Sequence, residues 1–266
     1  MGGVCFEMGR ACFEMNQRSV LVTGAAKRIG AAISRRFGAA GWHVVIHYQQ
    51  AQAWAEGLAG ELPSAEIIRC DLADSAAALA MVYDLAERLA DWRCLINNAS
   101  VFAPDDVTAL NPATNREAMQ INAVTPALMA QAFLARARSG AGRRVIQMTD
   151  QKLANPNPDF FSYTMSKAAA DSAGQMLGMA VRPGDRVYRL APGAILPSHD
   201  QSEVEADRSH LLNLLMRRTG ADEVADAALF LAEGPLASGQ VLYIDSGQHL
   251  LAQTRDVIYL GRGEAG

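Results

Sequence analysis

Short apolar runs alternate along the chain with longer segments in which apolar residues recur about every 3.6 positions. The runs are rich in β-branched residues, and their continuous character is typical of strands buried on both faces. The predicted strands cover 19–23, 43–48, 66–70, 94–99, 144–149, 186–191 and 240–245. The segments between them include three Ala-, Leu- and Met-rich stretches with helical spacing, predicted as helices over 30–41, 76–90 and 162–181.

This alternation of strands and helices predicts an α/β fold. Right-handed crossovers convert it into a doubly wound, Rossmann-like parallel sheet of seven strands with helices on both faces. Ligands of such sheets bind at the carboxyl ends of the strands. Candidate chemistry is therefore expected where the predicted strands end.

The chain is expected to form a single domain over residues 18–266. Half of its 266 residues are hydrophobic and 20% are charged, which is enough apolar material for one sizeable core. There is no Pro-, Ser- or Gly-rich linker. Residues 1–17 contain a Cys-Phe-Glu-Met echo at 5–8 and 12–15. They are interpreted as an N-terminal extension that is disordered or reflects a misassigned start site.

Composition argues against several classes of partner. The net charge is −4 and the basic residues are scattered, so nucleic acid is not expected to bind. No uncharged apolar run reaches 18 residues and no secretory signal pattern opens the chain, so we expect a cytoplasmic protein without a membrane partner. The spacings of Cys5, Cys12, Cys70 and Cys94 fit neither a zinc site nor a disulfide framework. Free thiols and no metal are expected.

A glycine-containing turn follows the first predicted strand, in the sequence Thr-Gly-Ala-Ala-Lys-Arg-Ile-Gly over 23–30. Gly24 allows a tight turn, and Gly30 allows the following helix to pack closely on the strand. Free backbone N–H groups at the start of that helix favour an anion. Such a turn also occurs for steric reasons alone, but the strand before it and the helix after it favour phosphate binding.

The second predicted strand indicates which dinucleotide would bind. It ends at His47 and Tyr48 and is followed by two glutamines, where NAD enzymes often carry an acid for the ribose 2′-hydroxyl. No carboxylate is present there to repel a 2′-phosphate. Lys27 and Arg28 of the preceding turn could neutralise that phosphate, although they could also be a solvated pair. This pattern favours NADP over NAD.

Three motifs in order along the chain resemble the short-chain dehydrogenase/reductase family. They are the turn over 23–30, Asn-Asn-Ala over 97–99, and Tyr-x-x-x-Lys over 163–167. The resemblance covers roughly residues 18–250, nearly the whole chain. It implies a homotetramer in which the helix that follows the tyrosine packs against its counterpart.

Within that family the details resemble the pteridine reductase branch, which includes dihydromonapterin reductases. Arg28 stands where the general family has a glycine, as it does in that branch. The segment 97–102 is similar to the Asn-Asn-Ala-Ser-x-aromatic of the branch. Asp150 lies thirteen residues before Tyr163, where the general family has a catalytic serine and pteridine reductases have an aspartate.

One departure concerns the 2′-phosphate. Members of the branch carry an Arg and a Ser after the second strand, whereas this chain has Gln50 and Ala51. A preference for NADP would therefore depend on Lys27 and Arg28.

The resemblance implies NADPH as cofactor, with Pro192-Gly193 beside the nicotinamide and Asp71 at the adenine amino group. A helix N-cap is the alternative for Asp71. The cofactor-binding residues implied are Gly24, Lys27, Arg28, Ile29, Gly30, His47, Tyr48, Asp71, Asn98, Ala99, Ser100, Tyr163, Lys167, Pro192 and Gly193.

The expected chemistry is hydride transfer from the cofactor together with proton delivery by the protein. Tyr163 has an ordinary pKa of about 10 and needs a nearby cation to stabilise its phenolate. Lys167 is four residues further along the same helix face, so it is expected to lower that pKa. In the family this lysine also holds the nicotinamide ribose.

Asp150 points to the substrate class. A carboxylate cannot donate a hydrogen bond unless it is protonated, so it suits a substrate with donors or a basic nitrogen, such as a dihydropterin. Asp150 and Tyr163 are expected to relay a proton to the pterin ring. Ser100 and Phe102 complete the expected substrate site, with the Phe102 ring stacked on the pterin. The alternatives are that Asp150 caps the next segment and that Phe102 packs in a loop.

Asn122 and a polar stretch complete the predicted site. Asn122 resembles the family asparagine whose backbone kink holds a water beside the lysine, with buried hydrogen bonding as the alternative. Residues 198–203 and the amphipathic stretch 208–218 are expected to form a lid over the substrate. His199 and His210 are expected to be solvated rather than catalytic.

The sequence therefore predicts an NADPH-dependent reductase that converts a dihydropteridine to a tetrahydropteridine, for example dihydromonapterin, dihydrobiopterin or dihydrofolate. One alternative is a short-chain reductase of another carbonyl, such as a 3-oxoacyl thioester or a sugar, against which Asp150 argues. The other alternative is a redox sensor that binds NADP without turnover, against which Tyr163 and Lys167 argue.

Overall fold

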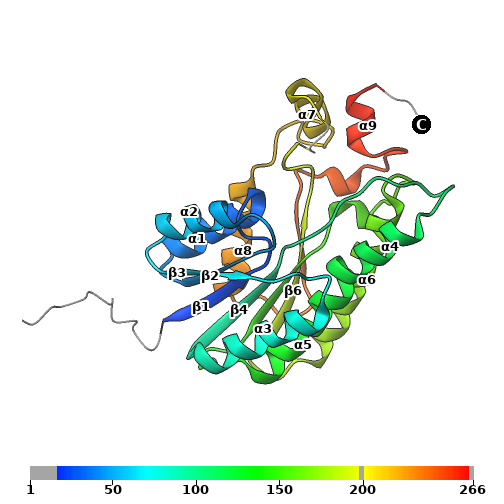
Figure 1. The fold of residues 1–266 in the computed structure, drawn as a ribbon. Coiled ribbons are helices and arrows are strands. Elements are labelled where there is room, and N and C mark those ends of the chain that lie inside the picture. Colours follow the sequence, from blue (N-terminus) through cyan, green and yellow to red (C-terminus); the bar gives the residue numbers. More distant parts are fainter. Residues whose placement is uncertain (1–16, 198–200, 264–266) are drawn as a thin grey trace, which may run out of the picture.

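A seven-stranded parallel sheet organises the computed structural model, which describes residues 17–197 and 201–263. Within these ranges every strand pairs in parallel with its neighbours, in the order β3-β2-β1-β4-β5-β6-β7 (Figure 1). The strands are β1 (Arg18–Val22), β2 (His43–Tyr48), β3 (Ala65–Arg69), β4 (Asp91–Asn97), β5 (Arg144–Met148), β6 (Arg186–Pro192) and β7 (Val241–Ile244). The predicted doubly wound sheet is confirmed.

Helices cover both faces of this sheet. On one face pack α1 (Arg28–Ala39), α2 (Gln52–Glu61) and α8 (Ala221–Glu233). On the other face pack α3 (Ser75–Arg88), α5 (Thr125–Arg136) and α6 (Phe161–Ala180), with α4 (Pro112–Met119) against α6. A π-helical turn, Gln120–Val124, joins α4 to α5.

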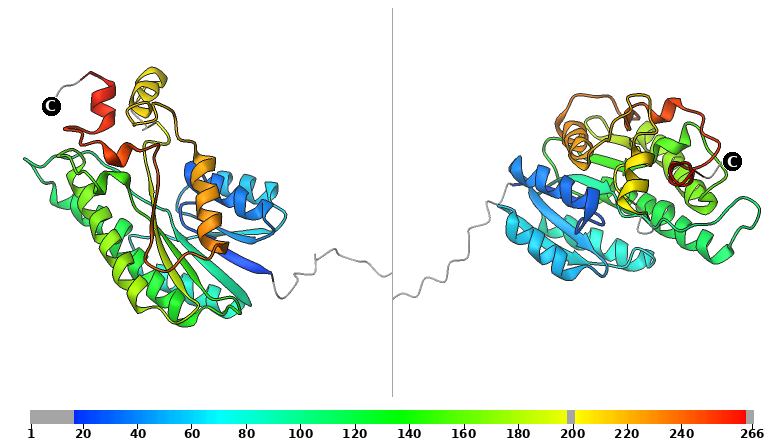
Figure 2. Two further views of the ribbon diagram at one scale, coloured as in Figure 1. Left: turned by 180° about the vertical axis from the view of Figure 1, so that it is seen from behind. Right: turned by 90° about the horizontal axis from the view of Figure 1, so that it is seen from above.

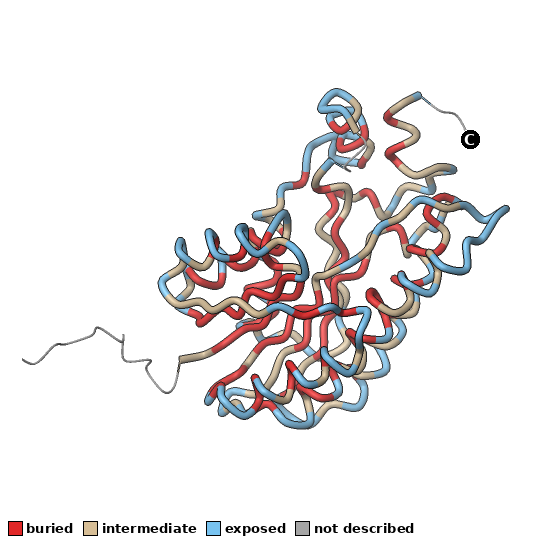
Figure 3. Tube along the Cα trace, viewed as in Figure 1, coloured by how far each residue is buried: buried red, intermediate tan, exposed pale blue. Residues whose placement is uncertain are grey.

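Two hydrophobic cores lie on the two faces of the sheet, as Figure 3 shows by the buried strands at its centre. Val20 and Val22 belong to the core under α1 and α8, whereas Leu21 between them belongs to the core under α3 and α5. All three are fully buried, because neighbouring side chains of a strand point to opposite faces. This double burial explains why the strands appear as continuous apolar runs.

Two short helices lie beyond the carboxyl edge of the sheet: α7 (Glu203–His210) and α9 (Val257–Gly261). They pack side by side, as Figures 1 and 2 show. Gly261 approaches the Glu205 carbonyl oxygen so closely that an added Cβ would lie 3.0 Å from it, and Arg262 pairs with the Glu205 carboxylate at 3.2 Å. The two helices form a cover over the edge where ligands of such sheets bind.

Several sequence-based expectations fall partly outside the described residues. The proposed N-terminal extension does so except for Gln17, as do Cys5 and Cys12. Cys70 and Cys94 are buried free thiols. In the described part of the chain no helix has the length and apolar character needed to cross a bilayer. Nor do three or more metal-ligating side chains gather anywhere in that part.

Candidate active site

A cavity of about 640 Å³ opens at the carboxyl edge of the sheet. The ends of β1 to β6 contribute to its wall, together with α6, α7 and the segment that precedes α9. Sixteen of the residues predicted from the sequence line it: Gly24, Lys27, Arg28, Ile29, Gly30, His47, Asp71, Asn98, Ala99, Ser100, Phe102, Asp150, Tyr163, Lys167, Pro192 and Gly193. Tyr48 and Asn122 do not.

The turn after β1 has the shape expected of a phosphate-binding turn. Gly24 adopts a φ of +61°, and a Cβ there would lie 2.9 Å from the Ala99 Cα. A Cβ on Gly30 would collide with the Gly24 carbonyl oxygen. Arg28 also has a left-handed backbone, with φ +56°. That conformation favours glycine, which explains why a glycine is usual at this position in the wider family.

The two basic residues of this turn have different surroundings. The Arg28 guanidinium donates to the Pro197 carbonyl oxygen at 2.9 Å. The Lys27 ammonium lies 5.0 Å from the ring centroid of Trp54 on α2, and that ring belongs to a residue that is 63% exposed. β2 is followed by Gln49, which lines the cavity, and by Gln50, so no carboxylate directly follows this strand. Asp71, which follows the neighbouring strand β3, lines the same cavity. Trp54 was not anticipated from the sequence.

His47 shapes the turn through both of its ring nitrogens. Its Nδ1 accepts from the Gly24 N–H at 3.0 Å, and its Nε2 donates to the Cys70 carbonyl oxygen at 3.1 Å. Burial lowers the pKa of His47 to about 4, so the ring is neutral near pH 7. Tyr48, the next residue, is buried in the core on the other side. Of these two residues only His47 lines the cavity, because adjacent strand residues point to opposite faces.

Asp71 follows β3 and does not have the capping role considered for it. The N-cap of α3 is Asp74, whose carboxylate accepts from the Ala76 and Ala77 N–H groups. Asp71 is exposed, lines the cavity and accepts from the nearby Ala73 N–H at 2.9 Å. The structure thus removes the helix N-cap as the alternative for Asp71.

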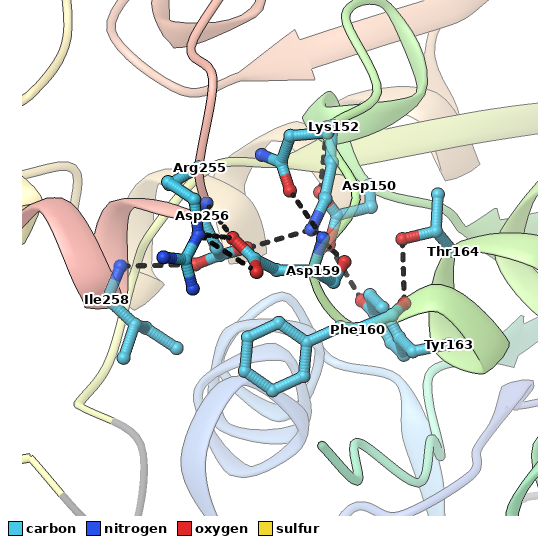
Figure 4. A network of polar contacts seen from close by, with 10 residues as sticks. Asp150, Lys152, Asp159, Phe160, Tyr163, Thr164, Arg255, Asp256 and Ile258 are labelled. Carbon is cyan, nitrogen blue, oxygen red and sulfur yellow. Dashed lines mark hydrogen bonds and ion pairs between the residues drawn. The ribbon is translucent and has the colours of Figure 1, made fainter. Parts of the chain in front are cut away.

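Asp150 and Tyr163 meet in the cavity wall (Figure 4). The Tyr163 hydroxyl donates to Asp150 Oδ2 at 2.7 Å. The other carboxylate oxygen, Oδ1, accepts from the Lys152 N–H at 2.8 Å and so caps the 3-10 turn Gln151–Leu153. Capping and contact with Tyr163 therefore occur together, one on each oxygen.

Burial determines the protonation behaviour of this group. It raises the pKa of Asp150, and burial together with Asp150 raises the pKa of Tyr163 well above its ordinary value. Burial lowers the pKa of Lys167 to about 8. The Lys167 ammonium donates to the Met148 carbonyl oxygen at 2.9 Å and lies 5.6 Å from the centroid of the Tyr163 ring. The expected lowering of the Tyr163 pKa by Lys167 is not found, because desolvation and the adjacent carboxylate dominate.

Asn122 does not line the cavity but forms hydrogen bonds to segments next to it. It lies within the π-helical turn, and its side chain pairs with both backbone groups of Val101 at 2.9 Å. Its Nδ2 also donates to Ser166 Oγ at 2.9 Å. The side chain thereby ties the segment after β4 to α6, which is the buried hydrogen-bonding role considered as the alternative.

Aromatic rings form one side of the site. Phe102 stacks on Phe160, with centroids 4.1 Å apart and planes inclined by 22°. It also meets the Tyr163 ring edge-on at 4.7 Å. Phe102 is 38% exposed, so part of the ring remains available to a ligand. Phe160 was not anticipated from the sequence, and its left-handed backbone, with φ +53°, opens α6.

The expected lid corresponds in part to α7. This helix begins with a capping box between Ser202 and Glu205, so the helical part starts earlier than the amphipathic stretch 208–218 suggested. His210 is 4% exposed and lines the cavity, which contradicts the expectation that it is solvated. Its position between the cavity and the α7–α9 contact explains the burial. His199 lies outside the described residues.

A polar network that the sequence did not reveal joins the C-terminal segment to the segment between Asp150 and Tyr163 (Figure 4). The Lys152 ammonium donates to the Asp159 carbonyl oxygen at 2.6 Å and pairs with the Asp256 carboxylate at 3.1 Å. Arg255 donates to the Asp159 carboxylate at 2.8 Å. The two ion pairs each join residues about a hundred positions apart in the sequence, so no local pattern signals the network.

Comparison with known proteins agrees with this geometry. The family model described as enoyl-(acyl carrier protein) reductase matches residues 24–249. The chain therefore belongs to the short-chain dehydrogenase/reductase family, as its motifs predicted.

Individual relatives cover most of the chain. A putative ketoacyl reductase 2 of granaticin polyketide synthase, from Streptomyces violaceoruber, is 31% identical over 87% of this chain and 96% of its own. Pteridine reductase 1 from Leishmania tarentolae is 27% identical over 86% of this chain and 96% of its own. The crystal structure of FolM alternative dihydrofolate reductase 1 from Brucella canis, complexed with NADP, superposes with a TM-score of 0.84, at 31% identity over 91% of this chain and 98% of that chain.

Proposed function

We propose that this protein is an NADPH-dependent reductase of a dihydropterin-type substrate. The observation that carries the proposal is the 2.7 Å hydrogen bond between the buried Tyr163 and the half-buried Asp150 in the wall of the cavity. A reductase of simple ketones needs a neutral donor beside its tyrosine, whereas Asp150 supplies a carboxyl group. The similarities to a pteridine reductase and to an alternative dihydrofolate reductase support the same substrate class.

The residues at the carboxyl edge fit a bound NADPH. A Cβ at Gly24 or Gly30 would collide with backbone atoms, so the turn can keep its tight shape only with glycine at these positions. The free N–H groups at the start of α1 favour an anion. Lys27 lines the cavity, and Gln49 and Gln50 follow β2 in place of an acid that would repel a 2′-phosphate. Lys167 would hold the nicotinamide ribose. When bound, the cofactor supplies the hydride.

Asp150 and Tyr163 would deliver the proton. The pKa values of Asp150 and Tyr163 are both raised. The proton in the hydrogen bond between them is therefore held more tightly than either group would hold a proton in water. A proton shared in this way can be passed to the basic imine nitrogen of a dihydropterin, whose affinity for protons grows as hydride arrives at the adjacent carbon. Asp150 would also accept a hydrogen bond from a ring amino group.

A steady-state assay tests this proposal most simply. NADPH oxidation would be followed with dihydrobiopterin, dihydromonapterin and dihydrofolate, and with an acetoacetyl thioester for comparison. We expect turnover of at least one dihydropteridine at a kcat/KM well above that of the thioester. Turnover of the thioester alone would favour a carbonyl reductase, the function that the similarity to a ketoacyl reductase supports. NADPH binding without any turnover would favour a redox sensor.

A homotetramer is proposed for the assembly. Along α6, the residues Ala168, Ser172, Met176 and Met179 are exposed at helical spacing. A face of small and apolar side chains allows a second copy of the helix to approach closely. Light scattering on the purified chain would test this, because a monomeric mass at micromolar concentration would contradict it.

A further inference from the structure

A paired ammonium and carboxylate stand in the cavity wall next to the proton-delivering residues. Lys152 follows Asp150 by two positions, and both line the cavity, as does Asp256. Lys152 is only 5% exposed. A buried ammonium is costly unless its protons are bonded, so its presence in a ligand cavity calls for a partner set.

The bonding capacity of this pair is only partly used. An ammonium has three N–H donors. Two of them have partners, the Asp159 carbonyl oxygen at 2.6 Å and Asp256 Oδ2 at 3.1 Å, and the ammonium also lies 5.4 Å from the centroid of the Phe160 ring. Asp256 Oδ1 accepts from the Ile258 N–H at 3.1 Å, and a carboxylate can accept more bonds than these. The wall therefore presents a proton source, then a donor, then an acceptor.

The reducing edge of a dihydropterin has the complementary order. Its N5 accepts the proton, its neighbouring 4-oxo oxygen accepts a hydrogen bond, and the adjacent N3–H donates one. Asp150, Lys152 and Asp256 line the same cavity, so a pteridine bound with N5 at the Asp150–Tyr163 pair could direct its 4-oxo edge toward Lys152. We propose, resting on the proposed function, that Lys152 and Asp256 are specificity-determining residues that bind the 4-oxo and N3–H groups of the pteridine ring.

A second ion pair in the same region provides a control, because it is a structural contact outside the cavity wall. Arg255 donates to both carboxylate oxygens of Asp159, at 3.0 and 2.8 Å, and so fastens the same C-terminal segment to the same loop. Unlike Lys152 and Asp256, Arg255 does not line the cavity. Arg255→Met is therefore a matched control that loosens the anchor without removing a side chain that lines the cavity.

The test compares two pteridines by calorimetry on NADP⁺-saturated protein. Pterin carries the 4-oxo acceptor, whereas 2,4-diaminopteridine carries a donor at that position. For Lys152→Met we expect pterin affinity to fall about 10-fold or more, as for loss of a charge-assisted hydrogen bond, and diaminopteridine affinity to stay within about 3-fold. Asp256→Asn, which keeps the side-chain shape, should shift the affinity ratio in the same direction. Arg255→Met should leave the ratio unchanged.

The possible results distinguish ligand binding by Lys152 and Asp256 from a purely structural role, and both from a failure of the proposed function. An equal loss for both pteridines in Lys152→Met, or a ratio shift as large in Arg255→Met, would assign the pair to anchoring alone and overturn the inference. Unchanged pterin binding in both wall variants would overturn it as well. Failure of the unmodified protein to bind either pteridine would instead count against the proposed function. If Lys152→Met does not fold, as its melting curve would show, Asp256→Asn decides on the same ratio.

Discussion

The Tyr163 hydroxyl and the Asp150 carboxylate are joined by a 2.7 Å hydrogen bond inside the cavity wall, although they lie on different elements. Asp150 follows β5 and Tyr163 lies in the first turn of α6. The second carboxylate oxygen is fixed by the Lys152 N–H, so the orientation of Asp150 is defined from both sides. This hydrogen bond is the structural basis of the proposed proton delivery.

The variant Asp150→Asn tests the part of this residue in proton delivery. The amide would retain the size of the side chain and the cap on the Lys152 N–H, but it cannot exchange a proton with Tyr163. We expect kcat for a dihydropterin to fall by about 10² to 10⁴, the range typical of losing a general acid. The Kd for NADPH, measured by fluorescence titration, should stay within about 2-fold of the original because Asp150 does not contact the phosphate turn.

Lys167 is predicted to give the proposed reaction an alkaline limit. Burial lowers its pKa to about 8, so its charge is present below that pH and is lost as the pH rises through it. Since the ammonium is the form proposed to hold the ribose, kcat/KM should decline above about pH 8. Lys167→Arg keeps its charge and should flatten the profile between about pH 8 and 9.5. A flat profile in the unmodified enzyme would argue against a role for this charge.

Lys27 is predicted to set the preference for NADPH over NADH. Its ammonium lies over Trp54 at the edge of the cavity. Loss of one charge-assisted contact with a phosphate should raise the Kd of NADPH about 10-fold in Lys27→Met. The Kd of NADH, which lacks the 2′-phosphate, should remain almost unchanged and serves as the internal control. Equal weakening of both cofactors would show that Lys27 does not read the 2′-phosphate.

Arg28 is predicted to carry backbone strain. Its φ of +56° disfavours any side chain with a Cβ. Arg28→Ala and Arg28→Gly both remove the contact with the Pro197 carbonyl oxygen, so they differ only at the backbone. Urea unfolding should show the glycine variant to be more stable than the alanine variant by about 1 kcal/mol. The reverse order would indicate that the turn is relaxed.

Much of the fold follows from the sequence because its signals are local. The continuous apolar runs predicted the strands of the sheet; in the inner strands, burial on both faces leaves no polar alternation, and the edge strands β3 and β7 are only partly buried. Most of the candidate site was also predictable, because parallel strands bring their carboxyl ends to one edge. The thirteen-residue spacing between Asp150 and Tyr163, together with the family resemblance, predicts that the two side chains meet, and the structure shows this contact.

The remaining features depend on contacts that no local pattern encodes. Lys152 meets Asp256 across 104 positions of the chain. His210 is buried in the cavity wall, which its polar neighbours in sequence do not indicate. The sequence predicts a lowered pKa for Tyr163 because it shows a nearby lysine. It does not show the loss of solvent, which raises this pKa instead.

The central claim is that the carboxyl group of Asp150 selects a dihydropterin over a carbonyl substrate. Asp150→Ser tests it directly, because it introduces the residue that the general family carries at this position. The measurement is the ratio of kcat/KM for dihydrobiopterin to kcat/KM for an acetoacetyl thioester. We predict that the ratio falls by about 10² or more in the variant, with NADPH binding retained. A ratio that is unchanged, or that rises, would contradict the claim.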